Sequence, residues 1–170
     1  MTGVETPVPA LAGADHISLT VTNLDRSERF YTEILGLLRL ADFGHVRILI
    51  HRQTSFLVGL IRHDATDGTP FTELNTGLDH LGFAASSRDE LVEWERRFVA
   101  HGVEHTPIRD MELGYHLNFR DPDNIALEIT VSSDVAAQWF AELREQEIPR
   151  QEIDARLHEY LTSLEPAPTE

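Results

Sequence analysis

The sequence of 170 residues lacks cysteine, long hydrophobic runs and an excess of positive charge. Without cysteine the chain can form no disulfide, thiolate zinc site or cysteine nucleophile, so its chemistry is left to His, Asp, Glu and Tyr. No apolar stretch approaches the roughly 20 residues that span a bilayer, and the first residues lack the basic and apolar regions of a secretory signal. We therefore expect a cytoplasmic protein with no membrane partner.

The charge balance excludes a further class of partner. Lys and Arg number 14 against 29 Asp and Glu, which gives a net charge of −15. No basic stripe is present to neutralise phosphates, so we expect no nucleic-acid partner, and an anionic membrane surface is disfavoured for the same reason. With 41% apolar and 25% charged residues, the composition is that of a folded globular protein.

The middle of the chain nearly repeats itself. The segment DHISLTVTNLDRSERFYTEILGL, which starts at Asp15, is echoed by DHLGFAASSRDELVEWERRFVAHGV, which starts at Asp79. In each copy an alternating apolar stretch precedes a polar turn and a helical pattern. The expected N-caps of the two helices are Ser27 and Asp89, and the expected glycines just after their C-terminal ends are Gly36 and Gly102.

Three more strand-like segments follow each helix, at 38–43, 45–52 and 55–63 in the first copy and at 104–109, 114–120 and 126–131 in the second. The sequence therefore predicts an α+β fold: two tandem βαβββ modules forming a cupped mixed sheet, with a C-terminal helical extension. We expect that extension to pack on the domain or on a partner subunit, the alternative being a lid over the site. The expected parts are a flexible tail (1–13), the first module (14–63), a linker (64–76), the second module (77–132), C-terminal helices (133–164) and a second tail (165–170).

Period-two alternation predicts which side chains share a face of each sheet. Apolar residues at every second position, such as Leu19 and Leu117, are assigned to the face covered by the helix. In the strand at 45–52 we assign Val46, Ile48 and Ile50 to this buried face. The opposite face then carries His16, Ser18, His45, Arg47, His51, His80, Gly82, Ala84, His116, Asn118 and Glu128.

Two imidazoles and one carboxylate with open positions form a facial triad, which holds Fe(II), Mn(II) or Zn(II). His16 and His80 occupy matching places on the first strands of the two copies, and Glu128 lies on the last strand. A single histidine in such a place is more often a structural residue than a ligand. The symmetry of the repeat favours the ligand interpretation for these three.

The segments DHISLTVTNLDRSERFYTEILGL, LDHLGFAA and NFRDPDNIALEIT resemble the vicinal oxygen chelate superfamily, which includes glyoxalase I, extradiol dioxygenases and the fosfomycin and bleomycin resistance proteins. The resemblance covers about residues 14–131, and Asn124 stands where the family usually has Gly, which a left-handed turn tolerates. It implies paired βαβββ modules, a homodimer and metal ligands at His16, His80 and Glu128. The position of a fourth ligand, Glu in bacterial glyoxalase I, falls on Gly59, which cannot bind a metal.

The resemblance further implies an enzyme whose metal chelates two neighbouring oxygens of a small substrate. His116 is the expected acid/base group, and Asn118 is expected to orient the substrate. His45, Arg47 and Ser18 are the expected substrate-binding residues. The three-ligand set favours dioxygenase chemistry by a small margin over a glyoxalase-type lyase or isomerase. The alternatives are a metal-free antibiotic-sequestering protein, to which the negative charge would draw cationic ligands, and an inactive scaffold.

Overall fold

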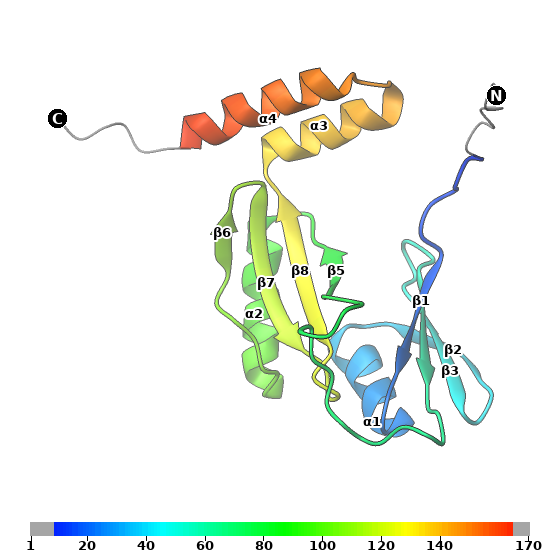
Figure 1. The fold of residues 1–170 in the computed structure, drawn as a ribbon. Helices are drawn as coiled ribbons and strands as arrows, with labels where there is room; N and C mark the ends of the chain where they lie inside the picture. The colour runs from blue at the N-terminus through cyan, green and yellow to red at the C-terminus, as the bar shows by residue number, and fades with distance from the viewer. Residues whose placement is uncertain (1–8, 165–170) are drawn as a thin grey trace, which may run out of the picture. The chain divides into compact units, whose positions relative to one another are not determined.

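The structure, a computed structural model, describes residues 9–164 of the chain. Residues 1–8 and 165–170, which include most of the two expected tails, lie outside the described residues. The chain divides into two compact units, Met1–Thr69 and Pro70–Glu170 (Figure 1). The two units are described one after the other.

The first unit is a four-stranded sheet with a helix against one face (Figure 1). Its sheet order is β1-β4-β3-β2, in which β1 is parallel to β4 and the other neighbours are antiparallel. The helix continues into a short π-helical segment, η1, before the chain returns to the sheet. The elements are β1 (His16–Thr20), α1 (Leu24–Arg29), η1 (Phe30–Ile34), β2 (Leu38–Asp42), β3 (Val46–Ile50) and β4 (Leu57–Ile61).

The second unit repeats this topology, with sheet order β5-β8-β7-β6 and β5 parallel to β8. A helical hairpin, α3 and α4, extends beyond the end of β8 (Figure 1). The structure thus confirms the α+β class, the two βαβββ modules and the C-terminal helices. The elements are β5 (Leu81–Ala84), α2 (Arg88–His101), β6 (Arg109–Met111), β7 (Gly114–Arg120), β8 (Ala126–Ser132), α3 (Asp134–Glu145) and α4 (Arg150–Leu164).

The helix starts differ from the predicted caps by two to four residues. The side chain of Asn23 accepts the backbone N–H of Arg26 at 3.0 Å, and that of Ser87 accepts the N–H of Glu90 at 3.2 Å. Both capping residues have extended backbones, which is the conformation that lets a short polar side chain reach the third N–H. The prediction of Ser27 and Asp89 was wrong because both lie inside the helices, whereas Gly102 does end α2 in the left-handed conformation.

The core of each unit lies between its sheet and its helix. In the second unit Phe98 of α2 is fully buried, with its ring centroid 4.5 Å from that of Phe119 on β7. In the first unit Leu49 of β3 is fully buried and pairs with the equally buried Val58 of β4.

The face predicted for β3 was therefore reversed. Leu49 lies on the helix side, and Val46, Ile48 and Ile50 are only half-buried. All positions of this strand except Arg47 are aliphatic, so alternation alone could not identify the covered face.

The segment that precedes β5 is anchored to the turn between β7 and β8. Arg120 makes a bidentate ion pair with Glu73, whose two carboxylate oxygens lie 2.7 and 3.0 Å from the guanidinium nitrogens. The amide of Asn124 donates to the carbonyl oxygen of Phe71 at 2.8 Å. Asn124 has φ 65°, which confirms that it serves as the left-handed residue of this turn. These contacts connect the expected linker region to the end of the strand that carries Glu128.

The Glu73–Arg120 pair makes this anchor sensitive to acid. The hydrogen bond from Arg120 lowers the pKa of Glu73 from 4.5 to about 2. Because the folded value lies below the unfolded value, the stabilisation is complete above about pH 4.5 and is lost as the pH falls to about 2. We expect Glu73→Gln to be less stable than wild type at pH 7 and the difference in melting temperature to vanish by about pH 2. Thermal unfolding followed by circular dichroism across this range measures it, and a difference that stays constant with pH would contradict the assignment.

The two helices of the C-terminal hairpin contact each other through their side chains. The rings of Trp139 and Tyr160 meet edge to face with centroids 5.5 Å apart, and Arg156 lies 2.6 Å from Glu142 across the two helices. None of the described helices is both long and apolar enough to cross a membrane.

Candidate functional site

The second unit brings together three of the residues predicted for the site. Glu128, in the middle of β8, has a side chain only 9% exposed. Its Oε2 lies 3.3 Å from Nε2 of His80, and its Oε1 lies 2.5 Å from Nδ1 of His116. The carboxylate therefore bridges two imidazoles, one from β7 and one from the residue directly before β5.

The strand register explains how this cluster forms. Glu128 pairs with Gly82 on β5 and with Asn118 on β7, so all three lie in one row across the sheet. A Cβ at position 82 would be 3.8 Å from Glu128 Oε2, an ordinary van der Waals distance, so the carboxylate lies directly beside the glycine. His116 lies two residues from Asn118 along β7 and so shares its face. The alternation predicted for β7 and β8 is correct.

His80 is held on its other side by the residue before it. Its Nδ1 lies 2.7 Å from the carboxylate of Asp79. This hydrogen bond raises the pKa of His80, and the negative charge of Glu128 raises it further, while partial burial acts in the opposite direction. An ionised carboxylate can only accept, so Nδ1 carries the proton and Nε2 faces Glu128.

The first unit contains the equivalent histidine–aspartate pair but has no carboxylate at the position that corresponds to Glu128. His16 begins β1, and its Nδ1 lies 2.9 Å from Asp15, as that of His80 does from Asp79. Ser18 pairs with Gly59 in the register in which Gly82 pairs with Glu128. Gly59 therefore stands in the place of Glu128, as expected from the sequence, and contributes no metal ligand.

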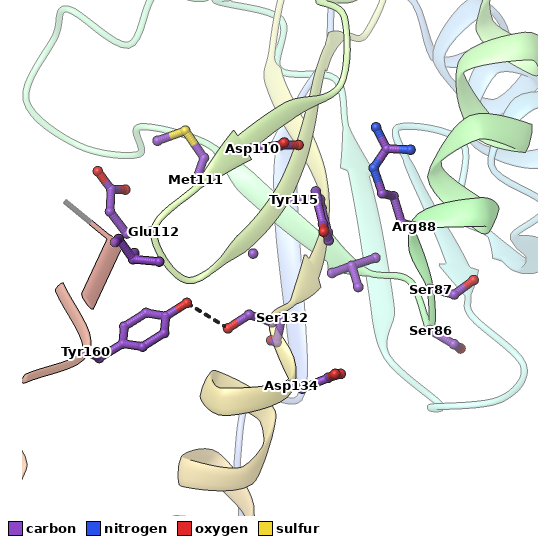
Figure 2. Close-up of a pocket in the computed structure, with 14 residues that line it drawn as sticks. Ser86, Ser87, Arg88, Asp110, Met111, Glu112, Tyr115, Ser132, Asp134 and Tyr160 are labelled. Carbon is purple, nitrogen blue, oxygen red and sulfur yellow. Dashed lines mark hydrogen bonds between the residues drawn. The ribbon is translucent and has the colours of Figure 1, made fainter. Parts of the chain in front are cut away.

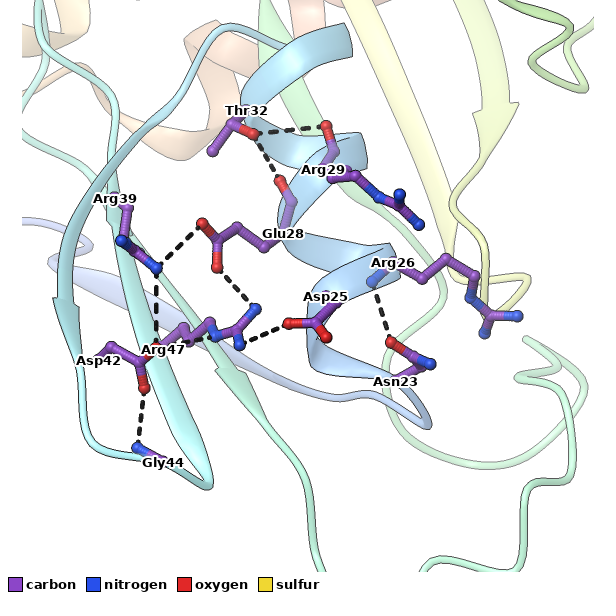
Figure 3. A network of polar contacts seen from close by, with 10 residues as sticks. All are labelled: Asn23, Asp25, Arg26, Glu28, Arg29, Thr32, Arg39, Asp42, Gly44 and Arg47. Atoms are coloured by element: carbon purple, nitrogen blue, oxygen red, sulfur yellow. Dashed lines mark hydrogen bonds and ion pairs between the residues drawn. The ribbon is translucent and has the colours of Figure 1, made fainter.

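Arg47 does not lie on the face predicted for it. Its guanidinium nitrogens are 2.6 Å from Asp25 and 2.7 Å from Glu28, both on α1, and 3.3 Å from Asp42 (Figure 3). These contacts place the side chain between sheet and helix, where it is 15% exposed. The prediction that Arg47 faces away from the helix is wrong because the carboxylates of α1 attract it to the covered side.

The sequence predicted that His45 lies on the same strand as Arg47 and binds the substrate with it. It lies in the exposed turn between β2 and β3, outside the strand whose alternation was used to place it. Because His45 lies outside β3, the strand register gives no support for its assignment to the histidine-bearing sheet face.

The donor pair of the second unit fits a divalent metal. Two ligands that bind one ion at about 2.0–2.2 Å and at angles of 90–110° are roughly 3.0–3.5 Å apart. The 3.3 Å between His80 Nε2 and Glu128 Oε2 lies in this range. His116 contacts the opposite oxygen of the carboxylate. Within residues 9–164 no group of three His, Asp or Glu side chains is arranged as a ready-made metal cage.

A separate cavity of about 500 Å³ lies in the second unit, among the starts of α2 and α3, the β6–β7 hairpin and α4 (Figure 2). Its wall includes Arg88, stacked over the ring of Tyr115 at 5.4 Å, and Tyr160, whose hydroxyl lies 3.5 Å from Ser133. None of the residues predicted for the metal or substrate lines it.

Comparison with known proteins identifies the family. The family described as the Glyoxalase/Bleomycin resistance protein/Dioxygenase superfamily matches residues 13–129. The chain belongs to this superfamily. A solved glyoxylase/bleomycin resistance protein/dioxygenase domain from Frankia sp. EAN1pec is 36% identical, with a TM-score of 0.67, over 73% of this chain and all of that one.

Two further solved structures share the fold. Lactoylglutathione lyase from Agrobacterium tumefaciens is 22% identical over 72% of this chain and 96% of its own, with a TM-score of 0.58. The fosfomycin resistance protein FosX from Listeria monocytogenes is 21% identical over 76% of this chain and 98% of its own, with a TM-score of 0.61. The helical hairpin lies beyond the region that the family matches.

Sequence reasoning missed Asp15 and Asp79. Each stands directly before a predicted histidine ligand and contacts its Nδ1. The signal that could have found them was present, since the dipeptide Asp-His opens both copies of the repeat.

Proposed function

We propose that this protein is a metal-dependent enzyme that binds a small substrate through two neighbouring oxygens. His80 and Glu128, together with His16 at the matching place in the first repeat, are the proposed ligands. The observation that carries the proposal is the buried carboxylate of Glu128 at a ligand-like distance from His80 Nε2. A carboxylate that is only 9% exposed, lies on the sheet face opposite the helix and is contacted by two imidazoles favours an ion site.

Each remaining residue of the cluster has a proposed task. A bound Fe(II), Mn(II) or Zn(II) would act as a Lewis acid on the two substrate oxygens. His116, with Nδ1 held by Glu128 Oε1, presents Nε2 as the atom that takes a proton from the substrate or returns it. The amide of Asn118, in the same row as Glu128, orients the substrate by hydrogen bonding. Ser18 is the proposed substrate contact of the first repeat.

Dioxygenase chemistry comes first among the reactions by a small margin. Because Gly59 has no side chain to bind a metal, the proposed ligands are two histidines and one carboxylate. Such a set has open coordination positions for a substrate and a second reactant. A lyase or isomerase needs only the Lewis acid and is the second reaction class. Oxygen uptake with catechols on the iron-loaded protein, against lyase and isomerase assays on the zinc- or manganese-loaded protein, distinguishes the two.

Metal content tests the proposal directly. We expect protein purified anaerobically without an affinity tag to hold about one Fe, Mn or Zn per chain, and His80→Ala and His16→Ala to lose it. The matched control is His158→Ala, which removes an exposed imidazole from α4. Elemental analysis and light scattering on the same samples give the metal stoichiometry and test the homodimer that we also propose. Full metal content in His80→Ala would overturn the ligand assignment.

A second function, metal-free binding of a cationic antibiotic, is favoured by the net charge of −15. Protein that holds no metal even after reconstitution, and that binds cationic glycopeptides in a salt-dependent titration, would establish this function in place of the first.

A further inference from the structure

The same side-chain contact occurs at the start of both repeats. Asp15 Oδ2 lies 2.9 Å from Nδ1 of His16, and Asp79 Oδ1 lies 2.7 Å from Nδ1 of His80. The two units have different residues around these pairs, yet the carboxylate meets the same imidazole nitrogen in each. The contact is thus a property of the repeat and not of one local environment.

An extended strand does not produce this contact by itself. Successive side chains of a strand point to opposite faces, so neighbours in a strand do not normally meet. Here each aspartate precedes its strand, since β1 begins at His16 and β5 at Leu81. The alternation of faces within the strands therefore does not govern these two side chains, although the carbonyl oxygen of Asp15 accepts the N–H of Leu57 at 3.3 Å.

The contact determines which nitrogen each histidine presents. An ionised carboxylate only accepts hydrogen bonds, so each Nδ1 donates to its aspartate and Nε2 is the ring nitrogen that remains for other contacts. In the second unit this Nε2 is the atom 3.3 Å from Glu128. Histidines that bind metals are typically oriented by such a hydrogen bond from the other ring nitrogen.

We propose that Asp15 and Asp79 are positioning residues that hold His16 and His80 with Nε2 directed at a divalent metal. Neither aspartate touches the ion. This inference rests on the proposed function, and it adds that metal affinity depends on two carboxylates outside the ligand set. Both side chains are exposed, at 83% for Asp15 and 78% for Asp79, so the contacts contribute little to folding.

The test compares metal affinity with stability in matched variants. We expect Asp79→Ala and Asp15→Ala to weaken Zn(II) and Co(II) binding by roughly 10- to 100-fold, with the melting temperature of the metal-free protein unchanged. Asp79→Asn should recover part of the affinity, because the amide oxygen still accepts from Nδ1. The control is Asp64→Ala, which removes one negative charge from an exposed loop and should bind as wild type.

A spectroscopic measurement separates positioning from a loss of local structure. The visible absorption bands of Co(II) report the geometry of its ligands, and we expect them to shift in Asp79→Ala but not in Asp64→Ala. Affinity and spectrum equal to the control in both alanine variants, with binding still abolished in His80→Ala, would overturn this inference and leave the proposed function standing. Wild-type protein that binds neither metal would overturn both.

Discussion

Replacing Glu128 with Gln should weaken metal binding by more than about 100-fold, the largest functional effect that we expect from one substitution. Glutamine keeps the size of the side chain but removes the negative charge that attracts the cation and the two imidazoles. Because the Glu128 side chain is only 9% exposed, water compensates poorly for the lost negative charge. Isothermal titration of the metal-free protein with Zn(II) measures the loss.

Glu104→Gln is the matched control, because it removes one carboxylate from an exposed position of the same unit. Its affinity should equal that of wild type. Stoichiometric binding by Glu128→Gln with unchanged affinity would show that the ion lies elsewhere, and circular dichroism confirms that the variant is folded.

Arg47→Ala should lower the free energy of unfolding by about 2–3 kcal/mol without changing metal affinity. The substitution removes the ion pairs of 2.6 Å to Asp25 and 2.7 Å to Glu28, and leaves Glu28 and Asp42 only the longer contacts of 3.6 and 3.7 Å to Arg39 (Figure 3). Glu28 is only 18% exposed, so solvent compensates its charge poorly. Chemical denaturation gives the free energy, and titration with Zn(II) gives the affinity.

The control in the same cluster is Arg39→Ala. Arg39 is 52% exposed and lies 3.6 and 3.7 Å from its two carboxylates, so its removal should cost less than about 1 kcal/mol. If Arg47→Ala unfolded like wild type and instead weakened binding of a carboxylate-bearing substrate, the role in substrate binding would be restored.

Where one side of a strand is clearly polar, the sequence predicted correctly which side chains share a face. On β7 the apolar Leu117 and Phe119 alternate with His116 and Asn118, and this pattern placed the residues around Glu128 on one face. On β3 the sequence VRILI is aliphatic on both faces, and Arg47 faces the helix because of carboxylates from an element distant in sequence. Alternation contains no information about such tertiary contacts.

The helix caps were predicted wrongly, and the aspartates were overlooked, for reasons that lie in the local backbone. Asn23 and Ser27 both have side chains that can cap a helix. Which of them does so depends on where the extended backbone ends, and the helical pattern of apolar residues does not define that point. Asp15 and Asp79 were visible as a repeated dipeptide, but their contact with the imidazole depends on the strand starting one or two residues later.

The pairing of Ser18 with Gly59 has a consequence for engineering a carboxylate into the first repeat. A Cβ at position 59 would lie 2.9 Å from Ser18 Oγ, whereas a Cβ at position 82 would lie 3.8 Å from Glu128 Oε2, an ordinary van der Waals distance. A carboxylate placed at position 59 therefore fits only if the hydroxyl of Ser18 rotates away or position 18 becomes glycine. Substitutions at these two positions are expected to be non-additive.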